Sequence, residues 1–138
     1  MAKEMRSVAG VYFDRFNHRE SELNCPVPFN LELIVVIPCH NEPDLLGSLQ
    51  SLKNAVVPID ISVEVITVVN HEIDADSDIL KQNGTTVIQA NRFSSENNSE
   101  SITFKTLEVF DMPAKKAGVG LARKIGMDEA LNRFSKIN

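Results

Sequence analysis

The sequence predicts an α/β domain in which a mostly parallel sheet is flanked by helices. Short runs of aliphatic and β-branched residues, each followed by a loop, are typical of buried strands. Stretches with a helical spacing of apolar residues separate these runs, and strands joined through helices pair in parallel by right-handed crossovers. The chain has 138 residues, of which 43% are hydrophobic and 24% charged, as expected for one globular domain.

The first strand is expected at residues 32–37, ELIVVI, and the first helix after the loop that follows it. Pro43 suits the first turn of that helix, where a missing N–H group costs nothing. Asn41 or Glu42 should then lie near the N-cap, and leucines at helical spacing continue to about Ala55.

A second strand is expected at residues 63–69, VEVITVV. Ser77 is a candidate cap for a short helix that Gly84 would stop. The run TTVIQA at residues 85–90 predicts the third strand, and the polar stretch 92–111 predicts a long loop.

The last predicted element is a helix from about Val119, with apolar residues on one face and charged residues on the other. Residues 1–31 are expected to be a lead-in segment, with a short helix or loop followed by extended chain, and residues 32–138 the domain itself. The apolar face of the last helix consists of Leu121, Ala122, Ile125, Leu131 and Phe134.

The composition argues against several classes of protein. A net charge of −5 disfavours a nucleic-acid binder, which usually carries a basic patch. Two cysteines without metal-ligand spacing build no disulfide framework and indicate a reducing, cytoplasmic setting. The first residues lack the apolar run of a signal peptide, and the longest apolar run, residues 33–38, is far too short for a bilayer span. The composition leaves open a longer parent protein that lies peripherally on a membrane.

Three segments are expected at one edge of the sheet, where open α/β sheets bind their ligands. They are Pro38–Glu42, Asn70–Asp78 and the loop around Gly118. The N–H groups and the dipole at the start of the first helix favour anions, although Asn41 as a simple helix cap explains the same residues. We therefore expect the three segments to converge on a ligand.

The segment AKKAGVGLARKIG combines glycines with positive charge. Gly118 and Gly120 permit close approach of the backbone to a ligand, and Lys115, Lys116 and Arg123 suit a diphosphate. Arg123 stands where the GxGxxG fingerprint needs its third glycine, so the dinucleotide motif is not met. The alternative is a glycine-rich helix start with solvated basic residues.

The acidic run DADSD predicts no metal site. Asp74, Asp76 and Asp78 begin like a calcium-binding loop, but Ile79 occupies the position of its required glycine. A solvated acidic turn is the better interpretation.

The histidines and cysteines predict no catalytic residue. His40 and His71 both follow strands, but no third metal ligand accompanies them. Cys39 beside His40 has the composition of a thiolate–imidazole pair, yet adjacent residues of an extended segment point to opposite sides.

Three segments in order resemble the family 2 glycosyltransferases of the GT-A fold. They are LIVVIPCHNE at 33–42, VEVITVVN at 63–70 and KKAGVGLARKIGMDEAL at 115–131. The resemblance covers about residues 32–134 and implies a three-layer, Rossmann-like nucleotide-binding domain, present in part. It also implies a nucleotide-diphosphate sugar as the donor and an acceptor that the sequence does not name.

The family pattern assigns the first loop to the base and ribose pocket. Asn70 stands where the family usually has an aspartate that reads the base, and Arg123 matches the arginine of its glycine-loop helix. His40 replaces a common tyrosine, and Asn70 with His71 replaces an acidic pair, which puts uracil recognition in doubt. The residues expected to hold the nucleotide are Pro38, His40, Glu42, Asn70, Gly118 and Arg123.

The resemblance also implies parts that this sequence lacks. The family's metal motif and catalytic base would come after the last helix, so a divalent metal (Mn or Mg) is expected only in the full-length protein. We therefore expect no transferase turnover from this chain alone. In the family's sheet a later strand pairs beside the first, so residues 33–37 should form an apolar edge that invites self-association.

Two other functions stay open. A non-catalytic α/β binding or oligomerisation module would use the acidic loop or the exposed edge for partners, and nucleotides would not affect it. A different nucleotide-dependent enzyme on a Rossmann-like half would need a true phosphate fingerprint, which the sequence lacks.

Overall fold

The computed structural model describes residues 10, 12, 19–115 and 117–137, and within them it has an α/β fold. Three strands form one all-parallel sheet in the order β1-β2-β3, which confirms the predicted parallel pairing. Most of the segment expected to form a short helix or loop in the lead-in falls outside the described residues. In chain order the elements are β1 Leu31–Cys39, α2 Leu45–Lys53, β2 Ser62–Glu72, α3 Ser77–Asn97, β3 Ile102–Met112 and α4 Val119–Phe134.

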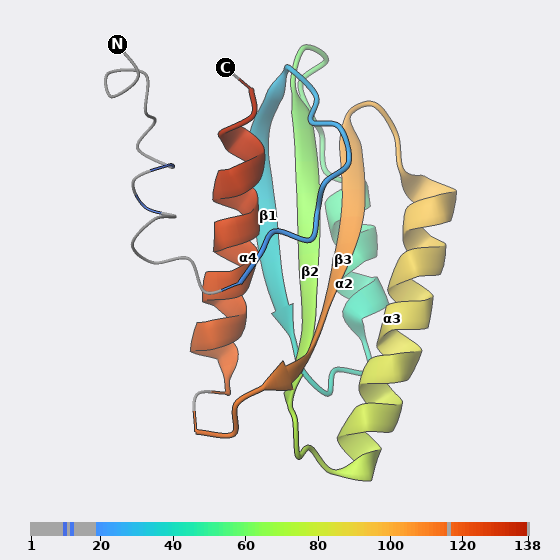
Figure 1. The fold of residues 1–138 in the computed structure, drawn as a ribbon. Coiled ribbons are helices and arrows are strands. Elements are labelled where there is room, and N and C mark those ends of the chain that lie inside the picture. Colours follow the sequence, from blue (N-terminus) through green and yellow to red (C-terminus); the bar gives the residue numbers. More distant parts are fainter. Residues whose placement is uncertain (1–9, 11, 13–18, 116, 138) are drawn as a thin grey trace.

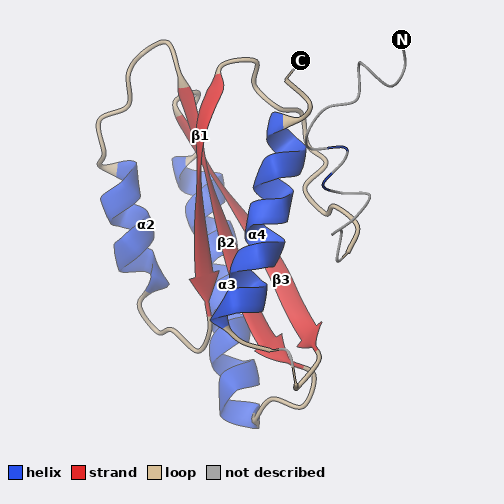
Figure 2. Cartoon of the chain, turned by 90° about the vertical axis from the view of Figure 1, so that its left-hand side faces the viewer, coloured by secondary structure: helices blue, strands red, loops and turns tan. Residues whose placement is uncertain are grey.

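Helices cover both faces of the sheet, so the fold has three layers (Figure 1, Figure 2). α2 and α3 lie on one face, where Leu49 and Phe93 join the core beneath them. α4 lies on the opposite face, over a second core that contains Ala122 and Ile125. No helix among the described residues is both long enough and apolar enough to span a membrane.

β2 is the middle strand, and residues 62–71 are all buried. Val65 belongs to the core under α2 and α3, whereas the next residue, Ile66, belongs to the core under α4. A strand covered on both faces needs apolar side chains at consecutive positions, and the run VEVITVV provides them.

The predicted third strand at 85–90 and the long loop at 92–111 are wrong. Residues 77–97 form the single helix α3, which passes through Gly84 without a break. The residues of TTVIQA that are buried recur every three or four positions, and this face packs on the sheet and on α2. Packing of that face outweighs the strand preference of the β-branched residues. The buried residues of α3 are Asn83, Thr86, Val87, Ala90 and Phe93.

β3 lies within the stretch that the sequence predicts as a loop. Ile102 and Phe104 pack toward α3, and the Phe104 ring meets the Phe93 ring edge-on at 4.9 Å between centroids. Leu107 and Val109 pack toward α4. The strand therefore contributes side chains to both cores. The polar residues before it made its start look like part of a loop in the sequence.

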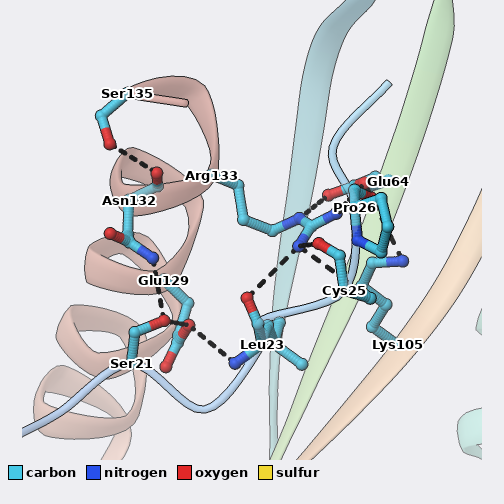
Figure 3. A network of polar contacts seen from close by, with 10 residues as sticks. All are labelled: Ser21, Leu23, Cys25, Pro26, Glu64, Lys105, Glu129, Asn132, Arg133 and Ser135. Carbon is cyan, nitrogen blue, oxygen red and sulfur yellow. Dashed lines mark hydrogen bonds and ion pairs between the residues drawn. The ribbon is translucent and has the colours of Figure 1, made fainter. Parts of the chain in front are cut away.

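Buried polar side chains tie the segment before β1 to α4 and to the sheet (Figure 3). Arg133 of α4 is 0% exposed and forms an ion pair with Glu64 of β2, which is 1% exposed. Its guanidinium also donates to the carbonyl oxygens of Leu23, Cys25 and Pro26. Each donor of this buried charge thus meets an acceptor, as a buried guanidinium requires.

Glu129, one turn earlier on α4, holds the same segment. Its carboxylate accepts hydrogen bonds from Ser21 Oγ at 2.9 Å and from the Glu22 amide at 2.7 Å. The Leu23 side chain packs against the core under α4. In Figure 1 this segment runs across the face of the sheet that α4 partly covers. Residues 21–26 therefore belong to the packed fold.

Candidate functional site

All three strands point to the same edge of the molecule, where α3 and α4 also begin (Figure 1). A cleft of about 550 Å³ opens at this edge. The three segments that the sequence places at this edge do meet here, since the last residues of β1 and β2, the turns that follow them and the turn into α4 all line the cleft. The lining residues are Pro38, Cys39, His40 and Glu42; Asn70, His71 and Glu72; Ala75 and Ile79; and Ala117, Gly118 and Val119.

Asn83 of α3 is hydrogen-bonded to both the turn after β1 and the end of β2. The side chain is 0% exposed, and its Oδ1 accepts a hydrogen bond from the Asn41 amide at 2.9 Å. Its Nδ2 lies 3.0 Å from the Asn70 carbonyl oxygen and 2.9 Å from His71 Nδ1. Asn41 has a φ of 50°, a left-handed conformation that asparagine tolerates, and the bond to Asn83 holds it there.

Two further side chains of α3 support the first turn. Thr86 Oγ1 donates to the Glu42 carbonyl oxygen at 3.2 Å, and Gln82 Nε2 donates to the same oxygen at 3.4 Å. The sequence prediction ended the helix at Gly84, so it placed Gln82 in a helix but assigned Thr86 to a strand and missed this role of α3. Buried Asn83 at the helical spacing of Thr86 and Val87 was the available signal.

Asn70 turns its amide nitrogen inward and its oxygen toward the cleft. Nδ2 donates to the carbonyl oxygens of Cys39 at 3.1 Å and Val68 at 3.0 Å. Among the described residues, the fully buried side-chain oxygens and nitrogens without a partner belong to Ser62 and Thr103 only. Since Oδ1 of Asn70 has no donor and is not in that set, it is accessible from the cleft.

His71 lies flat against Phe110, with 4.2 Å between ring centroids and 12° between ring planes. Burial lowers the pKa of His71 below its ordinary value, and the nearby His40 lowers it further. The imidazole is therefore neutral at neutral pH.

Cys39 faces the cleft as a thiol. Burial, with a smaller effect from the charge of Glu42, raises its pKa to about 11. Nucleophilic cysteines have a lowered pKa, so Cys39 does not have the properties of one.

The start of α2 differs from the prediction. Asp44 is the N-cap, in place of Asn41 or Glu42, and its Oδ1 accepts from the Gly47 amide at 3.3 Å. The Glu42 carboxylate accepts from the Asp44 amide at 2.8 Å. Because carboxylates of the chain already occupy these donors, this helix start is a poor anion site.

The start of α4 has no such cap. Gly118 is the N-cap residue with a φ of 141°, a conformation that favours glycine, and none of the described side chains bonds to the amides of the first turn. The first helical bond here runs from the Ala122 amide to the Gly118 carbonyl. The amide groups of Val119 and Gly120 therefore have no helical acceptor, and Val119 lines the cleft.

The described lining of the cleft mixes apolar and polar groups and is weakly acidic. Glu42, Glu72 and two histidines line it, but no lysine or arginine of the described residues does. Of the six residues expected to hold a nucleotide, Arg123 alone lies outside the lining and is exposed on α4. Lys115 is exposed, and the side chain of Lys116 lies outside the described residues.

The described residues do not fit a bound divalent metal. No group of three or more histidine, cysteine, aspartate or glutamate residues among them is arranged to hold one. We therefore assign no step that passes through a metal.

Comparison with known proteins adds no identification. No protein-family model matches the chain, and neither the curated proteins nor the solved structures contain a significant match.

Proposed function

We propose that this chain is the nucleotide-binding part of a glycosyltransferase and that its cleft holds the nucleoside of a nucleotide-diphosphate sugar. The observation that carries this proposal is the convergence of three turns, far apart in sequence, at the carboxyl ends of parallel strands. Ligands of open α/β sheets bind at that edge. A volume of about 550 Å³ lies within the range of small-molecule sites.

The charges of the cleft suit the neutral part of a nucleotide. A base and a ribose carry N–H groups, hydroxyls and carbonyl oxygens but no charge. The Glu42 carboxylate is an acceptor for ribose hydroxyls, and Asn70 Oδ1 is an acceptor for a base N–H group. The acidic lining would instead repel a phosphate placed at its centre.

The diphosphate would lie at the side of the cleft where α4 begins. The free amide groups after Gly118 and the positive end of the helix dipole favour a phosphate oxygen. Arg123, exposed one turn into α4, and Lys115, exposed just before it, supply positive charge close in sequence to this helix start. The sugar and the acceptor would then lie outside the cleft, and this proposal covers donor binding only.

A second candidate function is an assembly module. Among the described residues, β1 pairs with β2 alone, so one of its edges has no strand beside it. Leu33 of β1 is 52% exposed. An apolar, unprotected edge is a template for another strand, and a second copy of the chain would supply one.

Titration with UDP, GDP, ADP and CDP, followed by two-dimensional 1H–15N NMR, tests donor binding. We expect one or more nucleotides to shift the amide signals of Asn41, His71 and Val119 in a saturable way. The amides near Glu96, at the far end of α3, should not move. The proposal fails if no nucleotide shifts the cleft amides at millimolar concentration, or if the shifts cluster elsewhere.

A pair of matched variants makes the test specific to the cleft. Glu42→Gln keeps an oxygen for the Asp44 amide but removes the charge offered to the ribose, so nucleotide affinity should fall about tenfold. Glu96→Gln removes an equal charge from an exposed position and should bind as the unaltered chain does. Equal affinities for the two variants would contradict the ribose contact.

A further inference from the structure

We propose that Asn83 is a positioning residue that fixes His71 as a hydrogen-bond donor, with its proton on Nε2 and directed at the cleft. The role of that donor toward a nucleotide rests on the proposed function. The state of the imidazole itself does not, because it follows from the hydrogen bonds inside the protein.

The first step is the orientation of the Asn83 amide. A backbone N–H group can only donate, so the atom of Asn83 that meets the Asn41 amide must be the oxygen. A carbonyl oxygen can only accept, so the atom that meets the Asn70 carbonyl must be the nitrogen. Two partners on opposite sides of the amide thus fix its orientation independently.

The second step is the tautomer of His71. Asn83 Nδ2 has two protons, one for the Asn70 carbonyl and one for His71 Nδ1 at 2.9 Å. His71 Nδ1 must therefore accept, and a neutral imidazole whose Nδ1 accepts has its proton on Nε2. The stacked Phe110 ring keeps the imidazole in the plane that this contact requires.

The third step is the direction of Nε2. His71 lines the cleft, and no hydrogen bond within the described residues engages its Nε2. Nε2 is also not one of the fully buried unpaired atoms, so the cleft is where it can meet a partner. A ligand therefore meets an N–H donor here, which suits a carbonyl or hydroxyl oxygen.

The same arrangement limits what His71 can do. One nitrogen is occupied by Asn83 and the other carries a proton, so neither offers a lone pair to a metal ion or to a substrate proton. Protonation at Nδ1 would place two protons face to face and break the contact with Asn83. The other titratable groups that line the cleft, and so face His71, are His40, Glu42, Glu72 and the Cys39 thiol.

Long-range 1H–15N NMR on the full chain at pH 7.5 tests the tautomer without any ligand. We expect Nε2 of His71 to resonate as a protonated, pyrrole-type nitrogen and Nδ1 as an unprotonated, pyridine-type nitrogen. A proton on Nδ1, or an even mixture of tautomers, would overturn the proposal.

Asn83→Asp tests the role of Asn83 with a side chain of the same shape. A carboxylate offers no proton, so His71 must now present a proton on Nδ1, and its signals should change to the other tautomer or to the imidazolium. The control Asn91→Asp alters an exposed residue of the same helix and should leave His71 unchanged. Unchanged His71 signals in Asn83→Asp would overturn the proposal. If that variant does not fold, the spectrum of the unaltered chain still decides the tautomer.

Adding the tightest-binding nucleoside diphosphate separates this inference from the proposed function. A shift of the His71 Nε2 signal on saturation supports the donor role toward the ligand. Saturable shifts of the cleft amides without any change at Nε2 would overturn that role and leave nucleotide binding intact. If His71 has its proton on Nε2 without a ligand and no nucleotide changes any signal, the role of Asn83 is supported and the proposed function is contradicted.

Discussion

Arg133 of α4 and Glu64 of β2 form an ion pair beneath α4 that water does not reach. Burial by itself lowers the pKa of Arg133, but the hydrogen bonds and the charge of Glu64 raise it overall, so the guanidinium stays charged. Lys105 Nζ, 3.8 Å from the same carboxylate, is the second cation near Glu64. The pair joins the last helix to the middle strand.

Removing one partner of this pair should destabilise the protein strongly. Arg133→Met leaves the Glu64 carboxylate buried with Lys105 alone, and such a change costs about 3–5 kcal/mol in the free energy of unfolding. Urea denaturation followed by circular dichroism measures it. The control Arg123→Met, at an exposed position of α4, should change stability by less than about 0.5 kcal/mol. Similar losses for the two variants would show that the buried pair is unimportant.

Gly84→Ala should stabilise the protein. Gly84 lies inside α3, and an added Cβ would have no atom within 4 Å. Alanine in a helix interior is favoured over glycine by about 0.5–1 kcal/mol. If Gly84 instead ended a short helix, alanine would be strained there and the melting temperature would fall. Thermal unfolding of the two chains therefore distinguishes the long helix from the short one.

Gly126→Ala should have the opposite effect. A Cβ at Gly126 would clash with Val36 Cγ1 and lie 2.8 Å from Val68 Cγ2, where α4 packs closely on the sheet. Valine side chains are stiff, so we expect a loss of about 1–3 kcal/mol. Gly84→Ala is the matched control in the same urea experiment, and a gain in stability for both variants would contradict the close packing of α4.

The two cysteines should react at very different rates. Cys25 is exposed, whereas Cys39 is buried with a pKa raised to about 11. At pH 8 only about one Cys39 in a thousand would be a thiolate, so a thiol reagent such as DTNB should modify one site quickly. The variant Cys25→Ser should lose the fast phase, and a remaining fast phase would mean that Cys39 is accessible.

Cys39 also predicts an alkaline limit of stability. Its folded pKa, about 11, lies above the ordinary value of 9.0, so burial of the thiol stabilises the fold fully below pH 9. As the pH rises from 9 to 11, the Cys39 thiol loses its proton in the unfolded chain before it does so in the folded one. The stabilisation that the buried thiol contributes is therefore lost over this range. Urea midpoints across that range should fall less in Cys39→Ser than in the unaltered chain, and parallel curves would contradict the raised pKa.

The free edge of β1 should promote self-association. Sedimentation velocity at increasing concentration should show a rising mass for the unaltered chain, and Leu33→Lys should suppress it because a charge on an edge strand opposes pairing. Ile88→Lys, at a residue of α3 that is 71% exposed, controls for the loss of an exposed apolar side chain. A single monomeric species at all concentrations would exclude assembly through this edge.

The sequence predicted β2 from its uniform burial. VEVITVV is covered on both faces, so its apolar run identifies β2 directly. The predictions for α3 and β3 were wrong because the conformations that their residues favour locally differ from those that tertiary packing selects. Gly84 suggests the end of a helix, and TTVIQA suggests a strand. In the structure, every third or fourth residue of this stretch packs against the sheet or α2, and the stretch is helical. Polar residues around Ser99 hide the strand that starts at Ile102.

The candidate site was predicted in its location but not in its construction. Strand order and the position of the turns are enough to bring Pro38, Asn70 and Gly118 to one edge. The role of Asn83 depends on a contact with Asn41, 42 residues away, and no local pattern encodes it. The same holds for Arg123, whose spacing from Gly118 says nothing about the direction of its side chain.

The anchoring of residues 21–26 by Glu129 and Arg133 has a consequence for biosynthesis. Cys25 and Arg133, whose guanidinium donates to the Cys25 carbonyl, are 108 positions apart. A ribosome makes residues 21–26 before it makes α4. These residues therefore lack their hydrogen-bond partners, Glu129 and Arg133, until α4 has left the exit tunnel. Assembly of this domain can therefore be completed only after Arg133 has been made, and a ribosome stalled before residue 129 would present a sheet with one face still uncovered.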